Sequence, residues 1–456
     1  MRPDSNDPGL RRAIIQAVAD GFDRQVHFLA EFTRIPSLRG HEDAALDVMA
    51  GALRARGWSV DDWTASMDSL RHEPGFCDCA GDVPSIRSVV GTLAGGTGKS
   101  TGTGTGTGKS TDTSTGTAKG RSLILQGHLD VVPEGPHAMW HSPPFTPEIR
   151  DGWMYGRGAG DMKAGKVAAL FAVDALRRAG VTPSGRLHYQ SVVEEESSGM
   201  GALATLARGY RADCALIPEP TGLGLVRAQV GAIWFRLKVR GRPAHVAYAN
   251  TGSSAITATM HLIAALQEME AAWNDEARSH PHYRDVPHPL NFNAGKIAGG
   301  DWTSSLPAWC DVDCRMGLLP GDDVDTRRAQ IVDTIETAAA RHPFLRENPP
   351  EILWTGFMAD GYTLTDADAP EAALARAHHA ITGQDRPEDQ SWTALTDTRF
   401  YGLYHGIPSL CYGPLADSIH GFDERVELAS VQRCTEVIAL FIADWCGLDS
   451  LSDTAA

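Results

Sequence analysis

Residues 121–166 read RSLILQGHLDVVPEGPHAMWHSPPFTPEIRDGWMYGRGAGDMKAGK, and this stretch decides the fold. Arg121 to Gln126 is an aliphatic run typical of a buried strand. Apolar residues recur at helical spacing after Asp161, so we expect a helix that begins there. Open α/β sheets place ligand sites at the carboxyl ends of their strands, which is where His128 lies. For this stretch alone, the alternative is an ordinary helix capped by Asp161.

Acidic residues follow two further predicted strands. Glu194-Glu195-Glu196 comes directly after the strand at residues 186–193, and Glu219 follows the strand at residues 212–217. Adjacent carboxylates repel one another unless protons or cations compensate them, although a solvated charge run is the usual alternative. Together with His128 and Asp161, these oxygen and imidazole ligands suit zinc or a similar divalent cation.

Length and composition indicate a globular protein with two domains. The chain has 456 residues, of which 42% are hydrophobic and 21% charged. Its formal net charge of −16 argues against nucleic acid or an anionic membrane as the main partner. The 8 cysteines show no paired zinc-binding pattern, and we expect them to be reduced and buried. The polar start of the chain and its short apolar runs predict a cytoplasmic enzyme or binding protein.

A low-complexity tract at residues 95–120 consists almost wholly of Gly, Thr, Ser and Lys. It predicts a disordered loop between two strands, because it has no apolar side chains to bury. A nucleotide-binding phosphate loop is the alternative, but that motif needs a glycine five positions before each Gly-Lys-Ser glycine. Leu93 and Thr103 occupy those positions, so the motif fails twice.

The remaining pattern predicts an α/β domain interrupted by an α+β unit. The expected catalytic domain covers residues 1–228 and 345–456, and the inserted unit covers residues 229–344. The predicted helices are residues 10–32, 42–56, 255–273, 325–340, 371–381 and 428–445. The further predicted strands are residues 58–60, 86–93, 230–239, 290–297, 309–318 and 407–412.

Five motifs occur in order along the chain: Gly127–Pro133, Tyr155–Lys163, Glu194–Gly199, Pro218–Pro220 and His420–Glu424. In this order they resemble the co-catalytic zinc metallopeptidases and deacylases. That family includes acetylornithine deacetylase, succinyl-diaminopimelate desuccinylase, aminoacylase and bacterial glutamate carboxypeptidase. The resemblance implies a mostly parallel-sheet, zinc-peptidase-like catalytic domain with an inserted α+β lid and dimerisation domain.

The resemblance also implies two divalent metal ions, with zinc as the first expectation and cobalt or manganese as alternatives. Asp161 would bridge the two ions. His128 and Glu219 would complete the ligands of one ion, and Glu196 and His420 those of the other.

By the same resemblance, Glu195 would be the general base that activates a metal-bridging water, and Asp130 would orient His128. The chemistry supports both roles: a carboxylate beside a metal pair can take the proton of the water, and a carboxylate two residues from a histidine can hold its second nitrogen. His245 would hold the oxyanion in the active site of the partner subunit. Arg315 would bind a substrate carboxylate.

Asn293 and Arg399 are further polar candidates for substrate binding. Ser304 stands where the family has an asparagine, so the substrate class stays open. A surface-loop histidine is the alternative for His245, and structural roles are the alternative for Asn293 and Arg399.

The sequence therefore predicts a cytoplasmic, metal-dependent hydrolase that cleaves the amide bond of an N-acyl amino acid or small amine. The acyl group would be acetyl, succinyl, formyl or similar. The substrate is a small N-acyl amino acid or dipeptide-like molecule, and we expect a homodimer formed through the lid. A dipeptidase or carboxypeptidase is the alternative within the family. A catalytically silent dimeric binding protein is the alternative from another class, although the intact ligand set and Glu195 argue against it.

Overall fold

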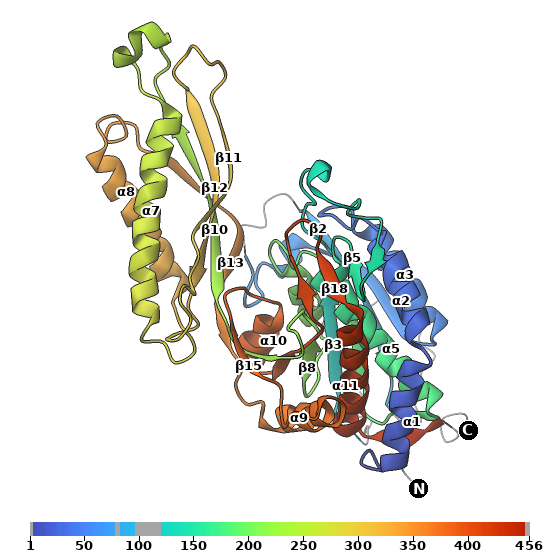
Figure 1. The fold of residues 1–456 in the computed structure, drawn as a ribbon. Helices are drawn as coiled ribbons and strands as arrows, with labels where there is room; N and C mark the ends of the chain where they lie inside the picture. The colour runs from blue at the N-terminus through green and yellow to red at the C-terminus, as the bar shows by residue number, and fades with distance from the viewer. Residues whose placement is uncertain (1–2, 78–82, 96–119, 452–456) are drawn as a thin grey trace.

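The computed structural model describes residues 3–77, 83–95 and 120–451 (Figure 1). The predicted low-complexity loop lies outside these residues except at its two ends. Within the described ranges, no helix combines the length and apolar character needed to cross a membrane. All seven cysteines of the described ranges are free and buried, as the sequence predicts.

The central sheet has six strands in the order β1-β2-β7-β3-β8-β16. Strand β3 is parallel to both β7 and β8, and β8 is parallel to β16, whereas β1 and β2 pair antiparallel at one edge. The centre of the sheet is therefore parallel, as predicted. The strands are β1 Ser59–Ser66, β2 Ser85–Leu93, β3 Leu123–His128, β7 Leu187–Val192, β8 Ala215–Ile217 and β16 Ser409–Cys411.

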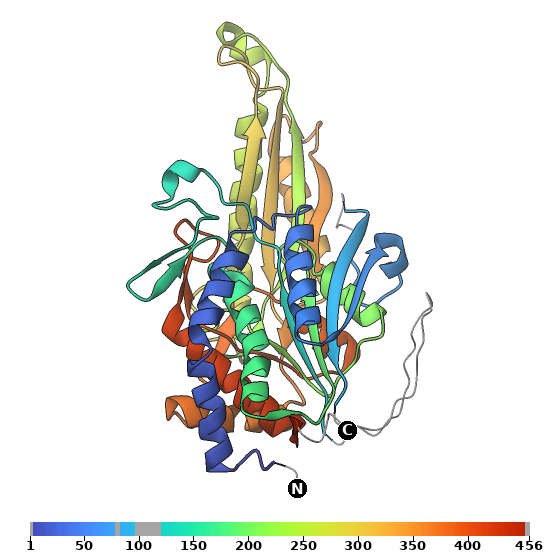
Figure 2. The same cartoon turned by 90° about the vertical axis from the view of Figure 1, so that its right-hand side faces the viewer.

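Helices cover this sheet and complete its core. Helix α5 contacts α1, α2 and α11, and Figure 2 shows α1, α2 and α5 in front of the sheet. The helices of this part are α1 Pro8–Ala19, α2 Phe22–Thr33, α3 Asp43–Ala55, α4 Met67–Leu70, α5 Gly165–Arg178, α6 Met200–Ala207, α9 Asp368–Thr382, α10 Thr398–His405 and α11 Leu428–Cys446.

Two of these helices correct the sequence prediction. The single helix expected over residues 10–32 is two helices, because the chain breaks at Asp20 and Gly21. Arg178 donates to the carbonyl of Ala17 there, and a Cβ on Gly21 would lie 2.0 Å from the Arg178 guanidinium. Helix α5 begins at Gly165 rather than at Asp161, which lies in the irregular helical turn η3, Ala159–Ala164.

A second sheet lies apart from the central one and has its own hydrophobic core (Figure 1). Its four strands are all antiparallel, in the order β11-β12-β10-β13. Helix α7 contacts β10, β11 and β12, and α8 contacts α7 and β13. These elements are β10 Gly231–Arg240, α7 Ala255–Ala277, β11 Asn293–Gly299, β12 Trp309–Leu318, α8 Val324–Arg341 and β13 Glu351–Ala359.

Strand β13 and the three smaller sheets are elements that the sequence prediction lacks. The pattern from Glu351 onward predicts a return to the α/β unit, yet β13 pairs with β10 in the second sheet. The small sheets consist of two- to five-residue strands, too short to show a period. They are β14 Tyr362–Thr363 with β9 Leu225–Gln229 and β15 Asp389–Trp392; β17 Ala416–Asp417 with β18 Arg425–Glu427, β5 Trp153–Tyr155 and β4 Glu148–Arg150; and β19 Leu448–Ser450 with β6 Val181–Pro183.

Candidate metal centre and adjoining cavity

Three neighbouring parallel strands deliver side chains to one edge of the central sheet. His128 is the last residue of β3, while Glu195 and Glu219 follow β7 and β8. All three are buried. The Nε2 atom of His128 lies 4.0 Å from Glu195 Oε2 and 3.9 Å from Glu219 Oε1. The strand ends therefore bring together residues that are up to 91 positions apart in the sequence.

Asp161 joins this group to a second one. Its Oδ1 lies 3.1 Å from His128 Nε2, and its Oδ2 lies 3.4 Å from His420 Nε2. Glu196 Oε2 is 3.1 Å from the same His420 nitrogen. Two triads that could each hold a metal ion result, His128–Asp161–Glu219 and Asp161–Glu196–His420, and they share Asp161.

The charges of the cluster favour a cation. Burial raises the pKa of Glu195 and Glu219 well above the usual range of a carboxyl, and it also raises that of Glu196. Burial works against a charged imidazole at His420, but the carboxylates of Glu196 and Asp161 outweigh it and raise the pKa of His420 to about 11. Without a metal, protons compensate the charge of these crowded carboxylates. A divalent cation can compensate the same charge in place of the protons. The imidazole and carboxylate donor set is one that Zn²⁺ accepts.

His128 is held by the loop that follows it. Its Nδ1 lies 2.9 Å from the backbone carbonyl oxygen of Asp130, whereas the Asp130 carboxylate is 3.5 Å away. Asp130 Oδ2 instead accepts a hydrogen bond from the backbone N–H of Glu196 at 3.1 Å. The sequence predicts the carboxylate as the partner of the imidazole. In the structure the nearer contact of His128 is the carbonyl group of Asp130, while the Asp130 carboxylate is hydrogen-bonded to the backbone of Glu196.

Glu424 organises the turn that carries Asp161. This fully buried carboxylate pairs with Arg157 at 2.6 Å. It also accepts backbone hydrogen bonds from Gly158, Gly160 and Asp161 at 3.0–3.1 Å. The sequence reasoning gives Glu424 no role, although it ends the His420–Glu424 motif.

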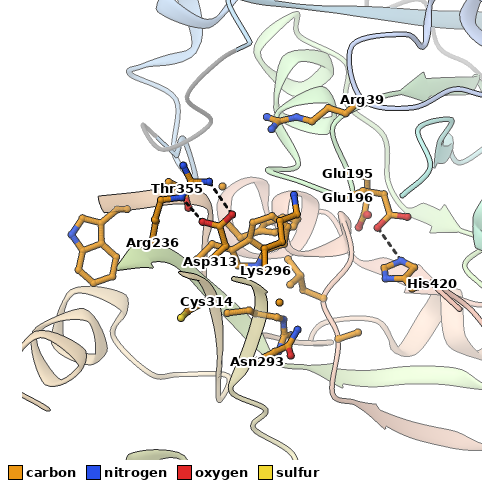
Figure 3. A pocket seen from close by; sticks show the side chains of 18 of the residues that line it. Arg39, Glu195, Glu196, Arg236, Asn293, Lys296, Asp313, Cys314, Thr355 and His420 are labelled. Atoms are coloured by element: carbon orange, nitrogen blue, oxygen red, sulfur yellow. Dashed lines mark hydrogen bonds and ion pairs between the residues drawn. The ribbon is translucent and has the colours of Figure 1, made fainter. Parts of the chain in front are cut away.

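A cavity of about 960 Å³ opens between the cluster and the second sheet (Figure 3). Glu195, Glu196 and His420 line one side of it, and Figure 3 shows them facing residues of the second sheet across the cavity. The predicted substrate residues Asn293 and Arg315 both line the opposite side. They are direct cross-strand partners on β11 and β12, and Arg315 donates to the carbonyl of Asn291 at 3.2 Å.

An aromatic wall, which the sequence reasoning does not predict, forms another part of the cavity lining. It consists of the rings of Trp234 and Phe357, with Leu395 packed beside them. The rings of Trp234 and Phe357 meet edge to face with centroids 5.2 Å apart. Gly356 has a φ of 61°, and a Cβ there would lie 2.3 Å from the Trp234 ring, so glycine makes room for the indole.

Arg399 and His245 are not among the residues that line the cavity. Arg399 is 2% exposed, donates to the carbonyl of Ser198 at 3.1 Å, and lies over the ring of Phe400. His245 is exposed, and its Nδ1 accepts a hydrogen bond from the backbone of Ala247 at 3.1 Å. It precedes the turn η4, Val246–Thr251, at the end of the second-sheet region far from the central sheet (Figure 1). The chain's own fold therefore does not bring His245 to the cluster.

A strand-edge cluster of histidines and carboxylates in an α/β fold provides the donor set that metal-dependent hydrolases use. Residues 124–444 match the model of peptidase family M20/M25/M40, and the chain belongs to this family. It is thus a metal-dependent hydrolase of amide bonds, and the sequence predictions of family, fold class and reaction class are confirmed.

Curated relatives and solved structures agree with this assignment. The chain is 30% identical over 347 residues to N-formyl-4-amino-5-aminomethyl-2-methylpyrimidine deformylase of Halalkalibacterium halodurans, which covers 72% of this chain and 80% of that protein. It is 29% identical over 334 residues to succinyl-diaminopimelate desuccinylase of Leptothrix cholodnii, covering 68% and 79%.

The fold is similar to that of human carnosine dipeptidase 1, with a TM-score of 0.73 at 15% identity over 96% of this chain and 99% of the other. It is also similar to that of an M20 family metallo-carboxypeptidase from Sulfolobus solfataricus. That comparison gives a TM-score of 0.65 at 14% identity over 93% of this chain and 99% of the other.

Proposed function

We propose that the chain removes a formyl or other small acyl group from a small amine, and that two zinc ions take part. The main support for this proposal is the pair of triads that share Asp161 and lie beside Glu195. His128 and Glu219 would hold one ion, Glu196 and His420 the other, and Asp161 both. Cobalt or manganese could replace zinc with the same nitrogen and oxygen donors.

In this proposal the residues of the chain divide the work around the scissile amide. When bound, the cations supply polarisation of the amide carbonyl and lower the pKa of water. Glu195 belongs to neither triad, so its carboxylate is left to take the proton of the attacking water. It then delivers that proton to the leaving amine. Asp130 and Glu424 keep His128 and Asp161 in place through the hydrogen bonds described above.

The cavity and the relatives favour a formylated amine that carries a ring. The deformylase relative acts, by its name, on an N-formyl aminomethylpyrimidine, and it is 30% identical to this chain. The aromatic wall of this chain offers a flat apolar surface for such a ring in the same cavity as Glu195.

Removal of a succinyl group is the second candidate. Arg315 and Asn293 face the cavity from adjacent strands, and a guanidinium beside an amide suits a carboxylate. The desuccinylase relative supports this alternative.

A homodimer formed through the second sheet is part of the proposal. Strand β11 is an edge strand of that sheet, and exposed apolar side chains lie on it and on helix α7. They include Ile297 at 53%, Met260 at 56% and Ile256 at 37% exposure. Pairing of two copies would cover this edge and these side chains. It would also bring His245 of one subunit to the cavity of the other, where its imidazole could hold the oxyanion.

A substrate panel tests the proposed function. The zinc-loaded protein is offered an N-formyl aminomethylpyrimidine, N-succinyl and N-acetyl amino acids, and simple dipeptides, and release of the free amine is measured. We expect the largest kcat/KM for a formylated ring amine. Preference for dipeptides would assign the chain to the peptidases of the family. Absence of turnover with every substrate, together with tight binding of one of them, would favour a silent binding protein.

A further inference from the structure

The side chain of Glu194, the first of the three adjacent glutamates, forms an ion pair of its own. Glu194 is buried, and its carboxylate accepts hydrogen bonds from Arg39 Nε at 2.5 Å and Nη2 at 2.9 Å. The hydroxyl of Ser198 donates to it at 2.8 Å. Arg39 is the cation paired with this carboxylate among the described residues. The Glu194 carboxylate is buried whereas the Arg39 side chain is 42% exposed, so loss of Arg39 would leave the buried carboxylate without its cation.

The backbone at Glu194 sets the direction of the next two residues. Its φ is 68°, a left-handed conformation that is strained for a residue with a side chain. Its carbonyl oxygen accepts hydrogen bonds from the backbone N–H groups of Ser197, Ser198 and Gly199. Beyond this turn, Glu196 meets His420 at 3.1 Å while Glu195 lies 4.0 Å from His128. The conformation of Glu194 therefore decides which side of the cluster each neighbour reaches.

The segment that carries Arg39 is fixed to the loop of His128 as well. The Ser37 hydroxyl donates to the carbonyl of Leu129, and the backbone N–H of Val131 donates to the carbonyl of Ser37 at 3.0 Å. Leu38 forms an isolated parallel bridge with Val131. Residues 37–39 therefore connect the loop after β3 with the turn after β7. Arg39 also lines the cavity, and Figure 3 shows its side chain on the same side as Glu195 and Glu196.

We infer that Arg39 is a positioning residue for amide hydrolysis. It fixes the carboxylate of Glu194 and so holds the turn that presents Glu195 as the base and Glu196 as a ligand. The inference rests on the proposed roles of these two glutamates. It differs from a role in which Arg39 binds an anionic group of the substrate, although its place on the cavity wall would allow that contact.

The first test measures Zn²⁺ affinity by competition with a chelator, with no substrate present. Arg39→Met should weaken binding about 10- to 100-fold, as loss of a residue that orients a metal ligand typically does. Arg39→Lys should recover part of the affinity, because an ammonium keeps the charge but loses the two-bond fork. The control is Arg34→Met, since exposed Arg34 pairs only with Glu31 among the described residues and should bind Zn²⁺ as the wild type does.

The second test is a double-mutant cycle measured by steady-state kinetics. Arg39→Met should lower kcat about 10- to 100-fold and leave KM within about threefold. Adding Glu194→Gln should restore much of that loss, because the buried carboxylate that lacked a partner is then neutral. Strong coupling between the two positions supports the inference.

Two results would overturn it. One is wild-type metal affinity and kcat in Arg39→Met. The other is a rise in KM alone that is equal with and without Glu194→Gln, which would assign Arg39 to substrate binding. If Arg39→Met does not fold, the same measurements of Zn²⁺ affinity, kcat and KM are made on Arg39→Lys, and the same two results would overturn the inference. If no substrate of the panel is hydrolysed, the proposed function fails, while the affinity measurement still tests Arg39.

Discussion

The two sides of the cavity differ in how their side chains are held. On the side of the central sheet, Glu195 lies 4.0 Å from His128 and Glu196 lies 3.1 Å from His420. On the side of the second sheet, Lys296 and Arg236 are exposed on the open face of antiparallel strands. The buried side chains of the first side depend on one another for their positions. An exposed side chain of the second side can be replaced without disturbing the first side. We therefore assign catalysis to the first side and selectivity to the second.

The largest expected effect is on the first side. Glu195→Gln should lower kcat by ~10²–10⁴-fold, the contribution of a general base, and leave metal content unchanged. Glu196→Gln should lose metal instead. Metal analysis together with single-turnover kinetics checks both variants. If Glu195→Gln lost metal while Glu196→Gln kept it, the roles of the two residues would be reversed.

Substitution of His245 tests whether catalysis needs a residue from outside the two sides of one cavity. If the proposed dimer forms, His245→Ala should lower kcat by ~10²–10³-fold with metal content unchanged, because one oxyanion donor would be lost. Mixing His245→Ala with Glu195→Gln should restore activity as subunits exchange, since one of the two sites in a mixed dimer is then intact. Fully exchanged mixtures that remain inactive would show that His245 does not act across the interface.

The second side should change selectivity far more than rate. Trp234→Leu should lower kcat/KM about tenfold for a formylated ring amine and little for a succinylated one, because a flat aromatic contact is lost. Arg315→Met should do the opposite: it should lower kcat/KM for a succinylated amine and change it little for a formylated ring amine. Trp309→Leu is the matched control, since Trp309 does not line the cavity. Equal losses on both substrates would contradict a division into catalysis and selectivity.

The smallest expected effect concerns Glu42, which accepts a hydrogen bond from the backbone N–H of Gly40 at 2.8 Å and lies near the carboxylates of Asp130 and Glu194. Burial raises the pKa of Glu42 from 4.5 to about 7. The folded state therefore binds this proton more tightly, and the resulting stability is complete below about pH 4.5 and lost as the pH rises through about 7. Relative to Glu42→Gln, the wild-type free energy of unfolding should fall by ~1 kcal/mol across this window, because solvent screens part of the pKa shift.

Urea unfolding of both proteins at several pH values, with chelator present, measures this difference. A difference between wild type and Glu42→Gln that does not vary with pH would show that Glu42 titrates normally.

Part of the first side can be located from the sequence, because three of its residues follow strands whose apolar runs are visible locally. His128, Glu196 and Glu219 are placed by this rule alone, since parallel strands end at one edge. Asp161 is predicted from the helical spacing that follows it, whereas the assignment of His420 depends on the family motif.

The support of the cluster and the second side could not be predicted in this way. Arg39 and Glu194 are 155 residues apart, and no periodic pattern records their contact. Glu424 acts on backbone N–H groups, which leave no trace in the side-chain sequence. The aromatic wall combines strands β10 and β13 with the loop of Leu395, and it forms only when the second sheet is placed against the central one.

Metal content tests the central claim most directly. Elemental analysis of the purified wild-type chain should find about two divalent ions per chain, and Glu195→Gln should match it. Asp161→Asn should retain far less than one, because both triads share Asp161. Chelation should abolish amide hydrolysis, and Zn²⁺ or Co²⁺ should restore it. Trace metal in the wild type, with activity unaffected by chelation and metal addition, would contradict the account.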